Sequence, residues 1–440
     1  MGKRRRQGTS FLRPTPAPAR HSSESHFHRV LFQTTFLQLI VQFQNGIFLS
    51  LVPRYRAWSR AFLAPNGIDD RVQKALRLSS RGDARYVLHA AVLDNELALV
   101  GLLHRCRPNI FTTDAFVLAA AHSHLRLLQY LYGLGLTGGT EALDIAAAGG
   151  YLAVVKWLVQ VGSGATTRAI DDAATHGHID IVRFLHRHGG FAATTAAMDG
   201  ATANRHGDIV KFLHTHRSEG CTTAAMDAAA LQGDLTMVSF LNQQRPEGCT
   251  TLAMDQAAAH GHLPIVQYLH EHRAEGCTSN AVDQAAASGH LAVVQYLSSN
   301  RMEGCTSHAI DYAAKNGHLR VVQYLHTHRL ARCSPLAIEF VAVTGGLEML
   351  TYLHAVCEAP VPPTALELAA RHGHVSLVKY LHERGVGVGS SRAMTLAIQF
   401  GHLNVVKYLH QHRVVKLHKS FLEVALEYQQ QKILQYLRRK

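Results

Sequence analysis

The stretch GHLPIVQYLHEHRAEGCTSNAVDQAAASGHLAVVQYL, residues 261–297, ends much as it begins. Its opening segment GHLPIVQYL, from Gly261, returns as GHLAVVQYL from Gly289. The same stretch holds His270, His272 and Cys277, whose side chains are of the kinds that bind zinc. It therefore raises two alternatives, a metal site or one unit of a repetitive chain.

The repeat extends through most of the chain. Aligned on the equivalent of Gly261, counted as position 0, thirteen units cover most of residues 83–440, with a period of 28 and two steps of 27. Position +8 is leucine in every unit, and position +7 is aromatic in all but the first. The position-0 residues are Asn95, Ser123, Gly150, Gly177, Arg205, Gly233, Gly261, Gly289, Gly317, Gly345, Gly373, Gly401 and Gln429. This agreement indicates that each unit occupies the same environment.

Each unit predicts two helices. Apolar positions +2, +5 and +8 share one helical face, and Pro264 at +3 suits a first helical turn. A threonine or serine at +17 is a typical N-cap for the other helix, and Pro335 directly follows Ser334. The predicted caps are Thr112, Thr140, Thr167, Thr194, Thr222, Thr250, Thr278, Thr306, Ser334 and Ser390. One such pair cannot bury its apolar stripe alone, so we expect an all-α solenoid of about thirteen stacked antiparallel helix pairs.

The order small-small-x-x-Gly-His-Leu, followed by Val-Val-x-Tyr-Leu, resembles the ankyrin repeat over about four-fifths of the chain. The ankyrin consensus is 33 residues long, so the resemblance implies a short variant with shortened or missing β-hairpins. At −6, where ankyrin repeats usually carry histidine, most units carry an acid. We interpret these acids as a solvated helix face, open to pairing with His or Arg of a neighbouring unit. They are Asp144, Asp171, Asp199, Asp227, Asp255, Asp283, Asp311, Glu339, Glu367 and Glu423.

The histidines and cysteines fit the repeat better than a metal site. Two residues apart on a helix point about 200° apart, and equivalent cysteines on stacked helices lie ~10 Å apart, beyond the ~7 Å limit for a disulfide. We therefore expect no metal and no cofactor. His at +9 and +11 would finish the second helix, Cys at +16 would fill space, and His at +1 would hydrogen-bond local backbone. The odd count of seven cysteines favours a reducing compartment.

The positive charge is concentrated at the start of the chain. Residues 1–64 hold ten Lys or Arg and one acid. We expect a basic, disordered tail at 1–29, a helical N-terminal cap region at 30–82 and the ankyrin-like array at 83–440. The apolar segment 30–52 contains too many amides for a membrane span. We expect a cytoplasmic chain, with a nuclear signal or a mitochondrial transit peptide as alternatives for the tail.

The sequence has no phosphate-binding glycine loop and no Gly-x-Ser-x-Gly nucleophile motif, so we predict that the protein is not an enzyme. Positions −2 and −1 vary between units. The resemblance implies that they lie on the concave surface of a protein-interaction scaffold, which we expect to be monomeric and to bind a protein partner. The predicted partner-binding residues are Thr175, His176, Asn204, Leu231, Gln232, His260, Ser288, Lys315, Asn316, Arg371 and His372.

Two alternatives use the N-terminal region instead. The chain could be an adaptor whose segment 30–64 recruits other machinery, through an F-box-like motif or a membrane tether. It could also bind nucleic acid through its basic tail.

Overall fold

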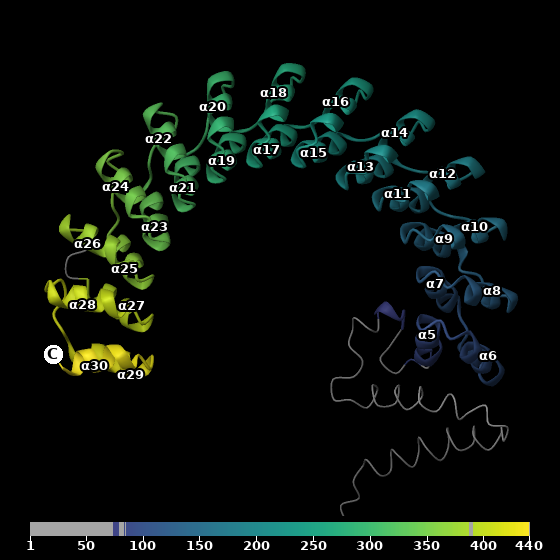
Figure 1. Cartoon of the computed structure of the whole chain (residues 1–440), viewed down its shortest axis with the longest axis horizontal. Coiled ribbons are helices and arrows are strands. Elements are labelled where there is room, and N and C mark those ends of the chain that lie inside the picture. Colours follow the sequence, from purple (N-terminus) through teal and green to yellow (C-terminus); the bar gives the residue numbers. More distant parts are fainter. Residues whose placement is uncertain (1–73, 79–82, 84, 387–389, 440) are drawn as a thin grey trace, which may run out of the picture. The chain divides into compact units, whose positions relative to one another are not determined.

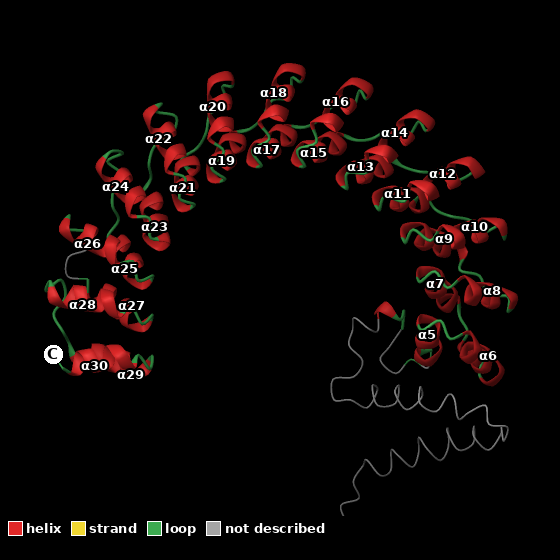
Figure 2. Ribbon diagram, viewed as in Figure 1, coloured by secondary structure: helices red, strands yellow, loops and turns green. Residues whose placement is uncertain are grey.

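The computed structural model describes residues 74–78, 83, 85–386 and 390–439. The chain divides into two compact units, Met1–Ala142 and Leu143–Lys440. Figure 2 shows that every regular element of the described residues is a helix. The predictions for the tail at 1–29, for the segment 30–64 and for most of the cap region lie outside the described residues.

The described residues contain thirteen pairs of α-helices, one pair for each sequence unit, which confirms the predicted all-α solenoid. The first helices of the pairs are α5 (Tyr86–Leu93), α7 (Thr113–Ala121), α9 (Gly139–Ala148), α11 (Arg168–Thr175), α13 (Thr195–Ala203), α15 (Thr223–Leu231), α17 (Thr251–Ala259), α19 (Ser279–Ala287), α21 (His308–Lys315), α23 (Pro335–Thr344), α25 (Thr364–Arg371), α27 (Ser391–Gln399) and α29 (Lys419–Glu427). The second helices are α6 (Leu97–Cys106), α8 (Leu125–Gly133), α10 (Leu152–Gln160), α12 (Ile179–His188), α14 (Gly207–His216), α16 (Leu235–Gln244), α18 (Leu263–His272), α20 (Leu291–Asn300), α22 (Leu319–Thr327), α24 (Leu347–Ala355), α26 (Val375–Glu383), α28 (Leu403–Gln411) and α30 (Gln431–Arg438). A 3₁₀ turn, η2 (Pro108–Ile110), joins α6 to α7.

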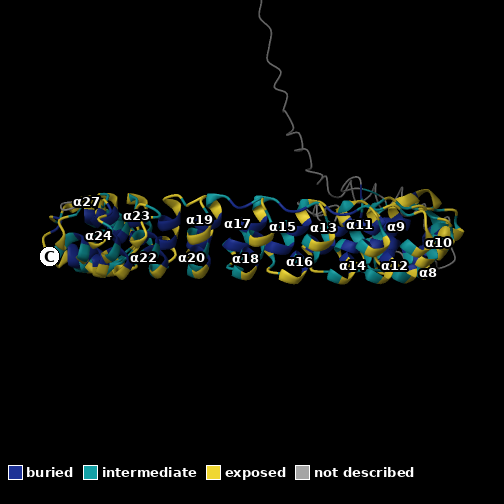
Figure 3. Cartoon of the chain, turned by 90° about the horizontal axis from the view of Figure 1, so that it is seen from above, coloured by how far each residue is buried: buried dark blue, intermediate teal, exposed yellow. Residues whose placement is uncertain are grey.

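The helix pairs of residues 143–440 form two rows. Figure 1 shows the first helices, α11 to α29, on the inner side of a curve and the second helices on the outer side. We call them the inner row and the outer row. Inner-row neighbours contact each other more extensively than outer-row neighbours do. Alanines such as Ala257 and Ala258, both 0% exposed, allow this close approach, and Figure 3 shows buried residues lying along the rows.

Threonine caps start most first helices where predicted. The Oγ1 atom of Thr250, for example, accepts a hydrogen bond from the backbone N–H of Leu252 at 3.1 Å. The two shorter steps of the repeat shift this start by one position. As a result Thr166 rather than the predicted Thr167 accepts from the next helix, and Thr140 lies inside α9. Thr112 precedes α7 without a capping bond from its side chain.

The turn between the two helices explains the glycine at position 0. All thirteen position-0 residues have a positive φ, between 55° and 93°, which glycine adopts without a Cβ clash. A second constraint comes from the next unit. A Cβ atom on Gly261 would lie 2.6 Å from Nδ1 of His290, the +1 histidine of that unit. Glycine therefore leaves room both for the turn and for the neighbouring ring.

The +1 histidines join units, which corrects the predicted bond to local backbone. Nε2 of His262 lies 3.2 Å from the carbonyl oxygen of Leu231, in the unit before it. His374 makes the same contact with Val343 at 2.8 Å. Each ring thus donates to a carbonyl at the end of the preceding inner-row helix, where carbonyl groups lack partners within the helix.

The −6 acids also join units, and they are not the solvated face that we expected. The carboxylate of Asp255, 6% exposed, accepts hydrogen bonds from the backbone N–H and the hydroxyl of Thr278, at 2.8 and 2.7 Å. The main partner is the start of the next inner-row helix, and the expected pairing with His or Arg of a neighbouring unit is found at Glu367, whose carboxylate lies 3.4 Å from Nε of Arg392. Both bonds form in Asp144–Thr166, Asp171–Thr194, Asp199–Thr222, Asp227–Thr250, Asp255–Thr278 and Asp283–Thr306. The hydroxyl bond alone is formed in Asp311–Ser334, Glu339–Thr364 and Glu367–Ser390.

Two glycine substitutions separate the constraints on the turn. Gly261 and Gly317 have similar φ values, 75° and 81°, but a Cβ atom on Gly317 would meet nothing within 4 Å. Gly317→Ala should cost only the left-handed conformation, about 1–2 kcal/mol. Gly261→Ala should cost about 1–3 kcal/mol more because it also displaces the ring of His290. Urea unfolding of both variants measures the difference, and equal losses would refute the role of the ring.

Substitution of Thr278 tests the bond between units. Thr278→Val removes a cap, worth about 1 kcal/mol, and deprives the buried Asp255 carboxylate of a donor, at about 1–3 kcal/mol. Thr278→Ser should retain most of the stability. The matched control is Thr215→Val, since this exposed hydroxyl bonds only Lys211 of its own helix and should change the free energy of unfolding by about 0.5 kcal/mol or less. Equal effects of the two valine substitutions in thermal melts would contradict the proposed linkage.

Candidate functional site

The predicted partner-binding residues lie at the C-terminal ends of inner-row helices. Each is the last residue of its helix or the residue that caps it, as Leu231 and Gln232 are for α15. All of them are exposed except Thr175 and Gln232, which are half-buried. The structure thus places the predicted residues along one edge of the inner row, but no contact with a partner tests them.

Some of these side chains connect units. Nδ2 of Asn316 donates to the carbonyl oxygen of Ala287 at 2.6 Å. Gln232 accepts from Nε of Arg205 at 2.8 Å and donates to the carbonyl oxygen of Ala203. Asn316 and Gln232 are therefore already engaged in the stack, so they are weaker candidates for binding than exposed neighbours such as Ser288.

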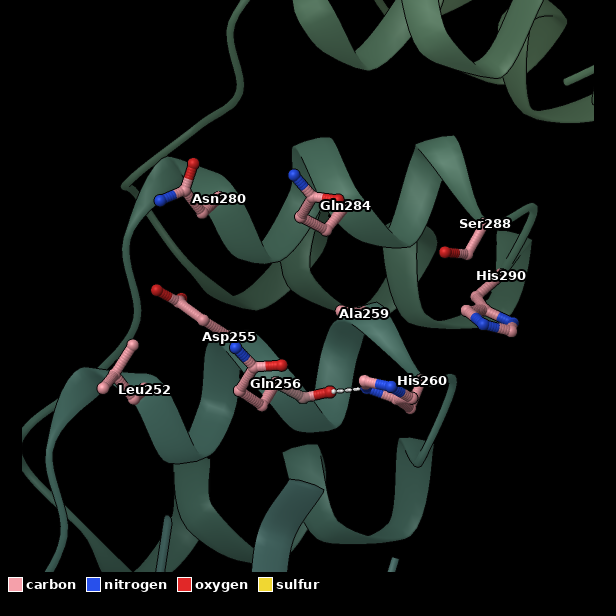
Figure 4. A pocket seen from close by; sticks show the side chains of 9 residues that line it. All are labelled: Leu252, Asp255, Gln256, Ala259, His260, Asn280, Gln284, Ser288 and His290. Atoms are coloured by element: carbon pink, nitrogen blue, oxygen red, sulfur yellow. Dashed lines mark hydrogen bonds between the residues drawn. The ribbon is translucent and has the colours of Figure 1, made fainter. Parts of the chain in front are cut away.

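A groove of about 660 Å³ opens between α17 and α19 (Figure 4). It is lined by Leu252, Asp255, Gln256, Ala259, His260, Asn280, Gln284, Ser288 and His290. His260 and Ser288 were predicted from the sequence. The residues at −9 and −5, namely Leu252, Gln256, Asn280 and Gln284, were missed. Positions −9, −5, −2 and −1 share one helical face, and the variation at −9 and −5 between units was the available signal.

The groove is polar but carries little free charge. Figure 4 shows the amides of Gln256, Asn280 and Gln284 projecting from the two helices. The one carboxylate, Asp255, already accepts two hydrogen bonds from Thr278. Amides offer both donors and acceptors, so the lining suits a polypeptide backbone or polar side chains.

Beyond the groove, the same helical face becomes apolar. The position −5 residues of α21 to α27 are Tyr312, Phe340, Leu368 and Leu396, which we call the apolar row. The rings of Tyr312 and Phe340 stack with centroids 5.7 Å apart. Nζ of Lys315 lies 5.0 Å from the centroid of Phe340, within the range of a cation–π contact. This part of the inner row therefore combines apolar area with positive charge.

The histidines at +9 and +11 pack on aromatic rings of the outer row. His270 meets Tyr296 of the next unit edge to face, with centroids 5.8 Å apart. His272 stacks on Tyr268 of its own helix, with centroids 4.2 Å apart. Tyr268 is half-buried, whereas Leu269 is 1% exposed. The aromatic positions thus take part in packing between units.

The cysteines at +16 are mostly buried in the stack. Burial raises the pKa of Cys221, Cys249 and Cys277 to about 11, so these thiols are neutral near pH 7. In the described part of the chain, no group of three or more His, Cys, Asp or Glu side chains is arranged to hold a metal ion. The described helices also include none that is long and apolar enough to cross a membrane.

Two histidines at the edge of the inner row, His290 and His372, resist protonation. Burial lowers the pKa of His290 below its usual 6.5, and nearby His260 and His262 add to this effect. Burial and the charge of Arg371 lower the pKa of His372 in the same direction. A lowered pKa means that the folded chain binds these protons less readily than the unfolded chain. The resulting stability is present above about pH 6.5 and is lost as the pH falls below that value.

Comparison with known proteins adds the family. A family model described as "Ankyrin repeats (many copies)" matches residues 254–297 and 282–326, and one described as "Ankyrin repeats (3 copies)" matches residues 366–440. No curated protein matches the chain. Among solved structures, the chain is similar to the pentatricopeptide repeat protein PPR10 in complex with an 18-nt psaJ RNA element, with a TM-score of 0.43 and 10% identity over 94% of this chain and 71% of that one.

The matched residues share their defining features with the remaining units. Positive φ at position 0 and a leucine at +8 occur in all thirteen units, inside and outside residues 254–326 and 366–440. Residues 254–326 and 366–440 are thus ankyrin repeats, and they are shorter than the ankyrin consensus.

Proposed function

We propose that the chain is a non-enzymatic scaffold that binds a protein partner along the exposed face of its inner row. Ankyrin repeats generally mediate protein–protein interaction. The observation that supports this face is its variability within a strict repeat. Positions −9, −5, −2 and −1 change from unit to unit, whereas position −4 beside them is alanine in twelve of the thirteen units and these alanines are buried.

The groove and the apolar row offer complementary chemistry to one partner. The amides around Gln256 and Gln284 can satisfy polar groups, and Tyr312 and Phe340 can take up apolar side chains. A few central anchors usually supply most of the affinity of an interface, and aromatic residues are enriched among them. We therefore assign the larger share of the binding energy to the apolar row. We expect the groove to determine where along the inner row the partner binds.

The chemistry of the described residues argues for binding rather than catalysis. The repeated acids from Asp144 to Glu367 accept hydrogen bonds from capping hydroxyls, and the thiols of Cys221, Cys249 and Cys277 are neutral. None of them is therefore poised as a general base or a nucleophile. The adaptor and nucleic-acid alternatives depend on residues 1–64, which lie outside the described residues.

A matched set of variants tests the proposal. The partner is first identified by capture on the full-length chain followed by mass spectrometry. Gln256→Ala with Gln284→Ala, and Tyr312→Ala with Phe340→Ala, should then weaken its binding by about tenfold or more, equivalent to about 1.4 kcal/mol. Glu271→Ala with Gln295→Ala changes exposed outer-row residues and should leave affinity unchanged. Titration calorimetry gives the affinity, and melting curves confirm that each variant is folded.

A core substitution distinguishes loss of the face from loss of the fold. Leu269→Ala removes buried methyl groups and should cost roughly 2–5 kcal/mol. Because each unit contacts only its neighbours, the loss should melt the central units first. If the inner-row variants bind normally while deletion of residues 1–64 abolishes binding, the inner row is not the site.

A further inference from the structure

Cysteine at +16 faces a defined position of the next unit, namely +12. Position +12 is arginine in four successive steps, and Arg245, Arg273 and Arg301 lie close enough to Cys221, Cys249 and Cys277 to affect the pKa of each thiol. The spacing of the backbone agrees. A Cβ atom placed on Gly220, directly before Cys221, would lie 2.1 Å from Nη2 of Arg245. Positions +16 and +12 of adjacent units therefore meet in this stack.

One step of the array replaces the arginine by a second cysteine. Position +16 of the unit at Gly317 is Cys333, and position +12 of the unit at Gly345 is Cys357. The sulfur of Cys305, one step earlier, lies 3.3 Å from the carbonyl oxygen of Leu330 at +13 of the next unit, so side chains at +16 reach this part of the chain. Cys333 and Cys357 lie close enough for each to shift the pKa of the other. Both side chains are half-buried, so small reagents can reach them. Cysteines at equivalent +16 positions are too far apart to form a disulfide. Cys333 and Cys357 occupy different positions, +16 and +12, which lie close together in the stack.

We propose that Cys333 and Cys357 form a redox-active dithiol that a hydroperoxide converts to a disulfide joining the two ends of the α23–α24 helix pair. The thiolate of Cys357 attacks the peroxide oxygen, which gives a sulfenic acid and, with one proton, releases an alcohol or water. The thiol of Cys333 then attacks the sulfenic sulfur, forms the S–S bond and releases water. The two thiols together lose two electrons and two protons, and one peroxide is reduced.

The environment distinguishes this pair from the other five cysteines. The hydrogen bond from Cys333 lowers the pKa of Cys357 and raises that of Cys333, so Cys357 is the more readily ionised thiol and attacks first. Burial raises the pKa of Cys106, and it raises those of Cys221, Cys249, Cys277 and Cys305 to about 11. At Cys305 the sulfur meets the carbonyl oxygen of Leu330, 3.3 Å away, rather than a second thiol.

The bond would act on the inner row. Cys333 lies just before α23 and Cys357 just after α24, so a disulfide closes the chain around this helix pair. Helix α23 carries Phe340 of the apolar row. Oxidation would thus fix the helix that presents this side chain.

The test uses the full-length chain. Reduced and desalted protein is treated with an equimolar amount of hydrogen peroxide, its remaining thiols are alkylated, and the products are cut after glutamate. Cleavage after Glu339 and Glu348 places Cys333 and Cys357 in separate peptides. We expect these two peptides to be found linked, two of the seven thiols to escape alkylation, and dithiothreitol to reverse both changes.

Variants decide whether the pair is responsible. Cys333→Ser and Cys357→Ser should each abolish the linked peptides, and Cys277→Ser should retain them. Cys357→Arg restores the residue found in other units, so it should fold normally and form no link. The proposal fails if all seven wild-type thiols are alkylated after peroxide, if links are spread among other cysteines or between molecules, or if Cys277→Ser abolishes the link as the pair variants do.

Discussion

The hydrogen bonds between the −6 acid of one unit and the capping threonine of the next are the interaction on which the array depends. The hydroxyl of Thr278 donates to Asp255 of the preceding unit and accepts from the backbone N–H of Asn280 in its own helix. One side chain thus starts a helix and joins it to its neighbour. Since a buried carboxylate is costly without donors, each unit stabilises the next only when the next helix begins at the right residue. Register and stacking are therefore specified together.

The turn at position 0 applies the same principle at the other end of the inner-row helix. Its positive φ favours glycine, and the +1 histidine of the following unit lies over that glycine, as His290 does over Gly261. Both ends of an inner-row helix such as α17 are thereby fixed by neighbouring units. The exposed face between them, at positions −9 and −5, has no such role. This freedom allows Gln256, Tyr312 and Phe340 to differ while the backbone repeats.

The sequence was sufficient to predict the helix pairs but not the contacts between them. The nearly constant period and the leucine at +8 identify equivalent residues, so thirteen helix pairs follow directly. Equivalence does not reveal which unlike positions meet across a unit boundary. The partner of Asp255 is 23 residues away at Thr278, and the partner of His262 is Leu231 in the preceding unit. Both were expected to have other partners, because a linear pattern contains no information on the offset between stacked units. The −5 residues of the groove were missed for a related reason, since the solvated face was assigned to the −6 acids and binding only to the helix ends.

Once it is known which positions of stacked units meet, departures from the repeat can be explained two residues at a time. Arg205 takes the place of the position-0 glycine, and the next unit has Asp234 rather than histidine at +1. Against its partial burial, hydrogen bonds from Thr236 and Met237 lower the pKa of Asp234, and the charge of Arg205 adds to this effect. In the unit after Gly317, Gly346 replaces the +1 histidine. A Cβ atom on Gly317 would therefore meet nothing within 4 Å. Cys357 departs from arginine at the position that faces Cys333. A pair of departures that meet across a unit boundary preserves the stack, whereas side chains on the inner face, such as Phe340 stacked on Tyr312, remain partly exposed. The first kind adds local chemistry to the scaffold, and the second kind leaves side chains available to a partner.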